Sequence, residues 1–182
     1  MTDELYKKQK LLKRAGSLLN SIISGLDAID LETRQKIMES CGEACARSDG
    51  DLEIATKIAK EEVDEKEILD RANKQILWCG PWVRKGTTIQ STCVECGCPL
   101  VRNKVVRLTG TFCYCSRGWV KKIFETLLKK PVEVELKKSI GLGNEVCQFV
   151  VSPINKIAEG DWDTHCPRKR RNTPILEPID RS

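Results

Sequence analysis

The residues best suited to chemistry in this sequence are its ten cysteines, five of which gather in one short stretch. Thiolates are soft ligands, and four of them complete the tetrahedral coordination that zinc prefers. Two thiols separated by one residue face the same side of an extended strand, so a hairpin would join two such pairs. We therefore predict a cysteine-only metal site that holds zinc, with an iron–sulfur cluster as the alternative and simple buried cysteines as the plainer interpretation. The predicted ligands are Cys93, Cys96, Cys98, Cys113 and Cys115.

Other thiols are candidates for a second site or for catalysis. Cys41 and Cys45 lie four residues apart, which places them on one face of a helix as a second metal or thiol site, or as packing residues. The single histidine, His165, lies near the C-terminal end, so no Cys–His or Ser–His arrangement is expected in the folded body. Cys115 is the candidate nucleophile, because a helix expected to start at Ser116 would lower the pKa of its thiol.

Composition and charge limit the class of protein. A chain of 182 residues suits one domain, and its net charge of +5 does not by itself indicate a nucleic-acid partner. The acidic start of the chain does not resemble a secretory signal, and no stretch reaches the roughly 18 apolar residues of a membrane span. We therefore expect a cytoplasmic protein without a membrane partner, in a compartment where clustered thiols bind metals more often than they form disulfides.

Helices are expected in the N-terminal part, over residues 5–76. Apolar residues recur every three or four positions across 5–26, as in an amphipathic helix that packs in a core or joins two copies as a homodimer. Asp30 is the expected N-cap of a second helix over 31–47. A third helix follows Gly50, and a capping box that begins at Asp64 starts a fourth.

The C-terminal part, over 87–152, is expected to form cysteine-rich strands, a helix and a hairpin. Alternating and β-branched residues predict strands over 87–94, 101–109 and 132–137, and a returning strand that starts at Cys147. A helix is expected between Ser116 and Pro131. Helices followed by strands around one helix indicate an α+β fold with a small antiparallel sheet and a metal knot in its middle. We expect one domain over 1–152 and a proline-containing tail of bases and acids over 153–182.

The segment from Cys113 to Val151 resembles the closing part of the vinyl-reductase-type small-molecule-binding domain. It has a Gly–Trp helix start at Gly118, the strand Pro131–Glu135, a glycine turn at Gly143 and a final strand with Cys147 and Phe149. Some relatives also look like the aminothiazoline-carboxylate hydrolase group. The resemblance implies helices and a small antiparallel sheet that enclose a small, often apolar or aromatic ligand, and it implies no fixed activity.

Three classes of function follow from these patterns. The first is a metal-braced small-molecule-binding domain, a sensor or scaffold, with Trp78, Trp82 and Trp119 as pocket or core walls. The second is a hydrolase or reductase for a small heterocyclic or aromatic substrate, which would use the metal or the Cys115 thiolate. The third is a zinc protein that binds nucleic acid, which only the basic residues around the cysteines and the run 168–171 favour.

Overall fold

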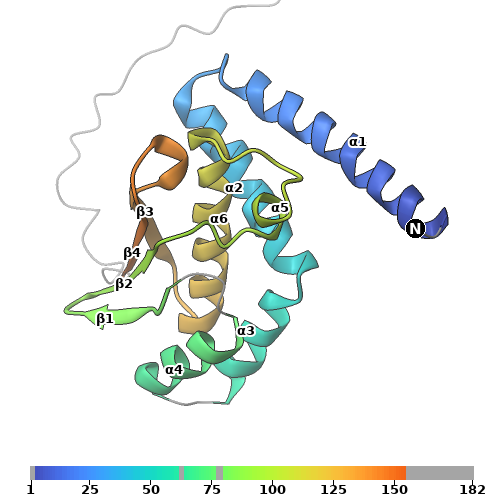
Figure 1. Cartoon of the computed structure of the whole chain (residues 1–182). Helices are drawn as coiled ribbons and strands as arrows, with labels where there is room; N and C mark the ends of the chain where they lie inside the picture. The colour runs from blue at the N-terminus through green and yellow to red at the C-terminus, as the bar shows by residue number, and fades with distance from the viewer. Residues whose placement is uncertain (1–2, 62–63, 77–79, 155–182) are drawn as a thin grey trace, which may run out of the picture.

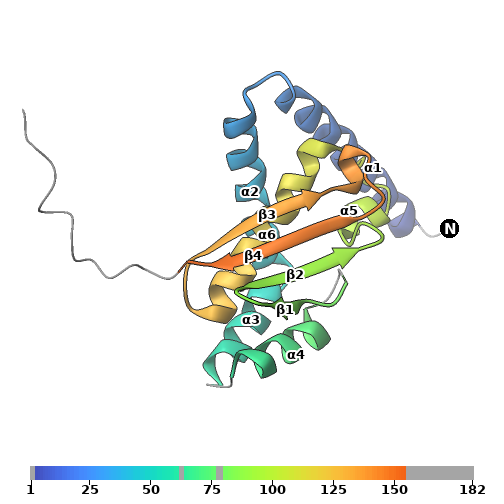
Figure 2. The ribbon, with the colours of Figure 1, turned by 90° about the vertical axis from the view of Figure 1, so that its left-hand side faces the viewer.

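The chain folds into a small antiparallel sheet with helices layered on one side of it. A computed structural model describes residues 3–61, 64–76 and 80–154. Figure 2 shows the sheet in front, helix α6 (Gly110–Leu128) behind it and helix α2 (Leu31–Ser48) behind α6. Helix α1 (Asp3–Leu26) projects away from this body, as Figure 1 shows. The fold is therefore α+β with N-terminal helices, as the sequence predicts.

The expected N-terminal helices form, and their predicted caps are confirmed. The Asp30 carboxylate accepts a hydrogen bond from the backbone N–H of Thr33 at 2.9 Å, at the start of α2. After helix α3 (Asp51–Lys60), the Asp64 carboxylate accepts from the N–H of Glu67 at 2.8 Å. These bonds satisfy backbone donors that the first helical turn leaves without partners. Asp64 thus starts helix α4 (Glu65–Gln75) where the sequence predicts it.

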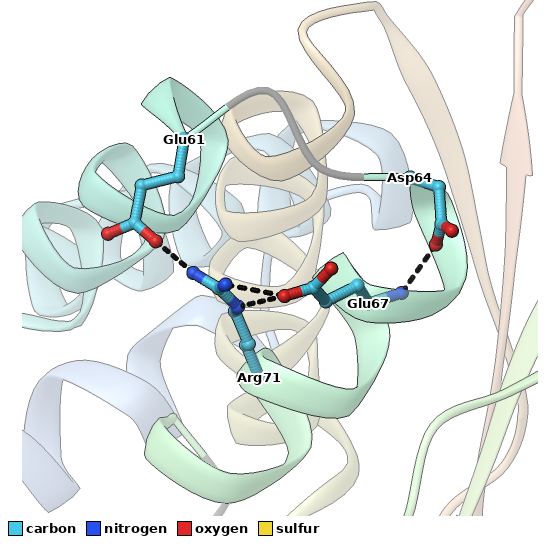
Figure 3. A network of polar contacts seen from close by, with 4 residues as sticks. All are labelled: Glu61, Asp64, Glu67 and Arg71. Atoms are coloured by element: carbon cyan, nitrogen blue, oxygen red, sulfur yellow. Dashed lines mark hydrogen bonds and ion pairs between the residues drawn. The ribbon is translucent and has the colours of Figure 1, made fainter.

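An arginine joins the end of α3 to α4. Figure 3 shows the Arg71 guanidinium between the carboxylates of Glu61 and Glu67. The Arg71 Nε donates to Glu67 Oε1 at 3.0 Å, one helical turn away. The side chains are partly exposed, so solvent screens these ion pairs and each contributes little to stability. They link the C-terminal end of α3 to α4.

The sheet is fully antiparallel, and its strand order is β1-β2-β4-β3. Its inward face packs on α6 through fully buried residues that include Ile89, Val132 and Val151. Cys93, the last residue of β2, pairs with Cys147, the first residue of β4. One end of the two central strands therefore brings together two cysteines that are far apart in the sequence. The strands are β1 (Val83–Lys85), β2 (Thr88–Cys93), β3 (Val132–Lys138) and β4 (Cys147–Pro153), with a short 3-10 helix, η1 (Ile140–Leu142), before β4.

The predicted strand over 101–109 is wrong. A short helix, α5 (Pro99–Arg102), covers its first residues, and no strand forms between α5 and α6. Helix α6 also begins earlier than expected: Thr109 is its N-cap and accepts a hydrogen bond from the N–H of Phe112 at 3.2 Å. Ser116 therefore lies inside the helix and caps nothing. The β-branched and aromatic residues here pack in the core, so tertiary burial overrides their preference for strands.

Helices α2 and α6 cross with their backbones in contact, and glycine makes this possible. A Cβ placed at Gly42 would lie 1.9 Å from the carbonyl oxygen of Cys115, and one at Gly118 would lie 2.1 Å from that of Glu39. No side chain larger than hydrogen fits at either position unless the helices separate. Beside the crossing, Arg117 forms an ion pair with Glu39 and donates to Gln35 at 3.3 Å. The crossing fixes where the cysteines of both helices lie.

Trp82 is a core residue that joins α6, the sheet and α4. Its ring centroid lies 4.8 Å from that of Phe124 in α6 and 6.0 Å from that of Phe149 in β4. The Asn73 side chain in α4 bonds both backbone groups of Trp82, at 2.8 Å each. These contacts hold the segment before β1, which has no ladder bonds of its own, against the core.

Candidate thiol site

Helix α6 contains Cys113 and Cys115, two cysteines that the sequence-based prediction placed on one face of a strand. Cys113 and Cys115 belong to a helix and not to a strand. Residues two apart in an α-helix point about 200° apart, so the two thiols face opposite sides of α6. The predicted knot of five cysteines is therefore divided: one group is joined by one further thiol of the chain, and the other group by two.

The first group lies between α6 and the sheet. Cys93, Cys96, Cys113 and Cys147 line one cavity of about 10 Å³, together with Glu95. We call this the thiol cavity. Its volume is close to what a single water molecule occupies, so it suits one ion and not an organic ligand. Three of its cysteines were predicted as ligands. Cys147 was not among the predicted ligands, although its position opposite Cys93 in the sheet brings it to the same cavity.

The chemical state of the thiol cavity is set by burial. Burial raises the pKa of the Cys96 thiol to about 11 and also raises the pKa of Cys113, which the Ser139 hydroxyl and the Gly141 backbone partly oppose. The backbone N–H of Ile140 donates to the Cys147 sulfur at 3.4 Å. Cys93 is disulfide-bonded in this structure, so its sulfur becomes a possible ligand only on reduction.

The described part of the chain contains no preformed set of metal ligands. Within residues 3–61, 64–76 and 80–154, no three Cys, His, Asp or Glu side chains are arranged to hold a metal ion. The four cysteines line one small cavity without that geometry. Coordination of zinc, with Zn–S distances near about 2.3 Å, would therefore require the side chains to turn inward.

The second group lies on the other side of α6, at the helix crossing. The Cys45 thiol of α2 interacts with the Cys115 thiol of α6, and Cys98 packs against the same small core cluster. Cys41 lies one turn before Cys45 and is exposed. We call these four residues the crossing thiols. Cys98 and Cys115, predicted as ligands with Cys93, thus belong beside the pair that was predicted as a second thiol site.

Cys115 does not have the environment expected of a nucleophile. Cys115 is the sixth residue of α6, so the positive end of the helix is more than a turn away. Hydrogen bonding to Cys45 and burial both raise the pKa of Cys115 well above its usual range. The same contact lowers the pKa of Cys45 to about 7, although burial opposes this. The more acidic thiol of this pair is therefore on α2.

Alkylation should distinguish these thiols by pH. We expect iodoacetamide to label Cys45 increasingly as pH rises through about 7, because its thiolate forms there. Cys115 should stay unlabelled at pH 8, because its raised pKa keeps it neutral and it is buried. Peptide mass spectrometry after timed labelling measures both, and urea-unfolded protein, in which every thiol reacts, is the control. Faster labelling of Cys115 than of Cys45 near neutral pH would contradict this assignment.

The tryptophans predicted as pocket or core walls are core residues where the structure describes them. Trp82 and Trp119 are buried, and the Trp119 side chain hydrogen-bonds Asp51. Trp78 lies outside the described residues, as does most of the predicted tail, from 155 to 182. Ligand-sized cavities in the described part lie on the surface. One of about 710 Å³ runs between α1 and α5, lined by Leu12, Leu100 and Val105 with lysines at its edges.

A long helix behind an antiparallel sheet, with thiols gathered on both sides of that helix, defines a thiol-rich α+β domain. The chain belongs to the family described as "Family of unknown function (DUF6144)", whose model matches residues 9–158. No functionally curated protein sequence matches the chain significantly. No helix among the described residues is long and apolar enough to cross a membrane.

One solved structure shows that the fold is shared with a subunit of a larger assembly. It is a trafficking protein particle complex subunit 3 from Naegleria fowleri covalently bound to palmitic acid. The TM-score is 0.50 at 16% sequence identity, and the match covers 82% of this chain and 96% of that one. At this identity the likeness concerns the fold alone, and function has to be argued from the site.

Proposed function

We propose that this chain is a binding or scaffold domain whose sheet and central helix are braced by one zinc ion in the thiol cavity. The observation that carries the proposal is the cavity itself, which is ion-sized and lined by Cys93, Cys96, Cys113 and Cys147. Four thiolates satisfy tetrahedral zinc without a histidine, and the only histidine of the chain is His165. This ligand set differs from the sequence-based one, because it includes Cys147 and leaves out Cys98 and Cys115, which pack in a core cluster beside Cys45.

The zinc would connect the sheet, helix α6 and the loop that follows β2. Cys93 and Cys147 lie at one end of the central strands of the sheet, Cys113 lies in the first turn of α6, and Cys96 lies in the loop between β2 and α5. Binding to such a site contributes directly to folding, because the unfolded chain has no preformed ligand set. Iron in a cluster of the same thiolates is the alternative occupant, and the small cavity favours a single ion.

Zinc affinity should depend on pH, because the thiols of the cavity must lose their protons to bind the metal. Burial raises the pKa values of Cys96 and Cys113, so these thiols carry protons at pH 7 when no metal is bound. Zinc has to displace those protons, and its affinity should therefore rise as pH rises from 6 to 8. Reduction of Cys93 is also required, so an oxidised sample should take up less metal.

Zinc binding by reduced full-length protein tests the proposal. We expect about one zinc per chain and a higher melting temperature, since a ligand at a thousand times its Kd stabilises the native state by about 4 kcal/mol. Cys96→Ser removes one ligand at a partly exposed position and should weaken binding by at least about tenfold. The measurements are competition with a chromophoric chelator and thermal unfolding with and without zinc.

Cys41→Ser is the matched control, because Cys41 is an exposed thiol outside the thiol cavity. It should leave zinc affinity unchanged. If reduced wild-type protein binds no zinc, or if Cys96→Ser binds zinc as tightly as wild type, the proposal fails. If Cys41→Ser loses the zinc instead, the site lies among the crossing thiols, and the placement in the thiol cavity is wrong.

For a small-molecule ligand, the surface groove between α1 and α5 is the best candidate. Its volume of about 710 Å³ lies in the range of ligand sites, and it combines apolar walls with Lys8, Lys13 and Lys104. Such a lining suits an apolar molecule with an anionic group. The resemblance to vinyl-reductase-type domains and the palmitic acid bound to the neighbouring structure support an apolar ligand.

A further inference from the structure

Helix α1 carries a row of apolar side chains that the body does not cover. Only Gly16 and Ile23 are buried in its 24 residues. In contrast, Leu11 is 68% exposed, Leu18 is 62% exposed and Ile22 is 51% exposed. An exposed Leu or Ile on its own needs no explanation, but a continuous row of them marks an interaction surface.

The exposed row lies on the side of α1 opposite its attachment to the body. The Asn20 side chain makes that attachment: its amide donates to the carbonyl of Val105 at 3.2 Å and its oxygen accepts from the N–H of Arg107 at 2.8 Å. At about 100° per residue, the middle of the row formed by Leu11, Leu18 and Ile22 lies about 180° from Asn20. Polar bonds therefore hold α1 in place and keep its apolar side turned outward.

We propose that a second copy of this chain covers the row, with the two α1 helices packed antiparallel about a two-fold axis. Area supports this occupant. The six exposed Leu and Ile side chains of α1 present on the order of 550 Å² per copy, so a symmetric pair would bury up to about 1,100 Å², which is close to the minimum of roughly 1,000 Å² for a specific interface. The six residues are Leu5, Leu11, Leu12, Leu18, Leu19 and Ile22.

The spacing of the leucines suits a helix partner. Leu11, Ala15, Leu18 and Ile22 follow one another along the exposed row at alternating steps of four and three residues. This is the spacing at which two helices pack their side chains along a shared seam. The seam is free of charge from residue 11 onward. A self-complementary stripe of this kind is what a two-fold interface requires, since the same patch meets itself.

Charge selects the antiparallel orientation. The first half of α1 carries Lys7, Lys8, Lys10, Lys13 and Arg14, and the second half carries no lysine or arginine. Parallel helices would place these five bases of one copy beside the same five of the other. Antiparallel helices that cross near Leu18 instead place each basic half beside an uncharged half, which avoids the repulsion between like charges.

The molecular mass of the full-length chain in solution tests the proposal. Sedimentation equilibrium should give a mass near twice 20.5 kDa at micromolar concentration. The double variant Leu11→Glu with Leu18→Glu should sediment as a monomer, because it places charges in the seam. Both residues are exposed, so the variant should keep its fold, which circular dichroism and the melting temperature check. The matched control is Ser17→Glu with Ser21→Glu, which adds the same charge outside the apolar row and should remain a dimer.

Three results would overturn the proposal. Wild-type protein could sediment as a monomer across the whole concentration range, or the folded Leu11→Glu with Leu18→Glu variant could remain a dimer. Alternatively, monomeric wild-type protein could bind vesicles that contain anionic phospholipid and lose that binding in the leucine variant. That outcome would assign the basic, apolar helix to a membrane surface. None of these measurements depends on zinc, so the proposal stands or falls separately from the metal site.

Discussion

Replacing Gly42 with alanine should destabilise the protein by about 3 kcal/mol, because the new methyl group has no room. Its Cβ would lie 1.9 Å from the carbonyl oxygen of Cys115 and 2.6 Å from the backbone nitrogen of Trp119. Both are backbone atoms of α6 and cannot rotate away as a side chain would. The helices would have to separate, and apolar contacts along the crossing would be lost. We expect the melting temperature to fall by about 6–12 °C.

Gly25→Ala is the control for this experiment. Gly25 lies in α1, and a Cβ there meets nothing within 4 Å. Alanine has the higher helix propensity, so this variant should be unchanged or more stable by up to about 1 kcal/mol. Urea unfolding of both variants gives the two free energies. If Gly42→Ala proves as stable as Gly25→Ala, the helices do not cross in backbone contact, and the two groups of thiols are not placed as described.

Trp82→Ala should cost about 3–5 kcal/mol of stability, which is typical of removing a large aromatic side chain from a core. Trp82 is 7% exposed and packs on Phe124 and Phe149. Its removal would leave a cavity between α6 and the sheet and would weaken the segment that Asn73 holds. Urea unfolding followed by far-UV circular dichroism measures the change.

Tyr6→Ala provides an aromatic control, since Tyr6 is 52% exposed on α1 and should change stability by less than about 0.5 kcal/mol. The result also separates the two sequence-based interpretations of Trp82. A core residue loses stability when truncated. If Trp82→Ala keeps wild-type stability and loses only the binding of a ligand, Trp82 is a wall of a ligand pocket. Its contacts with Phe124 and Phe149 would then not be what stabilises the core.

The N-terminal half of the fold could be predicted from sequence because its signals are local. Asp30 and Asp64 stand where helix caps are needed, and their hydrogen bonds form within three residues along the chain. The strand of alternating residues after Pro131 is similar, since one of its faces is buried and the other is exposed. In each case the pattern and the contact that stabilises it lie in the same short segment.

The segment from Pro99 to Ser116 could not be predicted in this way. Its Val, Thr, Phe and Tyr residues favour strands in isolation, but Phe112 packs in a core cluster with Ile23 and Met38, from helices far away in sequence. Thr109 is a suitable N-cap for α6. It was not predicted as one, because the spacing of Cys113 and Cys115 suggested a strand. Once α6 is placed, its helical period assigns Cys113 and Cys115 to different sites.

The candidate site could be predicted only in part, because some of its residues come together through contacts between distant segments. Clustering indicated that Cys93, Cys96 and Cys113 belong together, and the cavity contains all three. Cys147 was missed because it follows a hairpin and looks like an ordinary inward-facing strand residue. Only the pairing of β2 with β4 places it opposite Cys93. Strand register depends on contacts across about fifty residues, and no local pattern in this sequence reveals it.

The central claim is that the thiol cavity holds one zinc ion, and native mass spectrometry tests it most directly. The full-length chain would be purified without oxygen, treated with a mild reductant and weighed intact, before and after incubation with equimolar zinc. The account predicts one species that is heavier by a single zinc ion, with the added mass lost in Cys96→Ser and kept in Cys41→Ser. A chain that remains at its metal-free mass after reduction and zinc addition would contradict it.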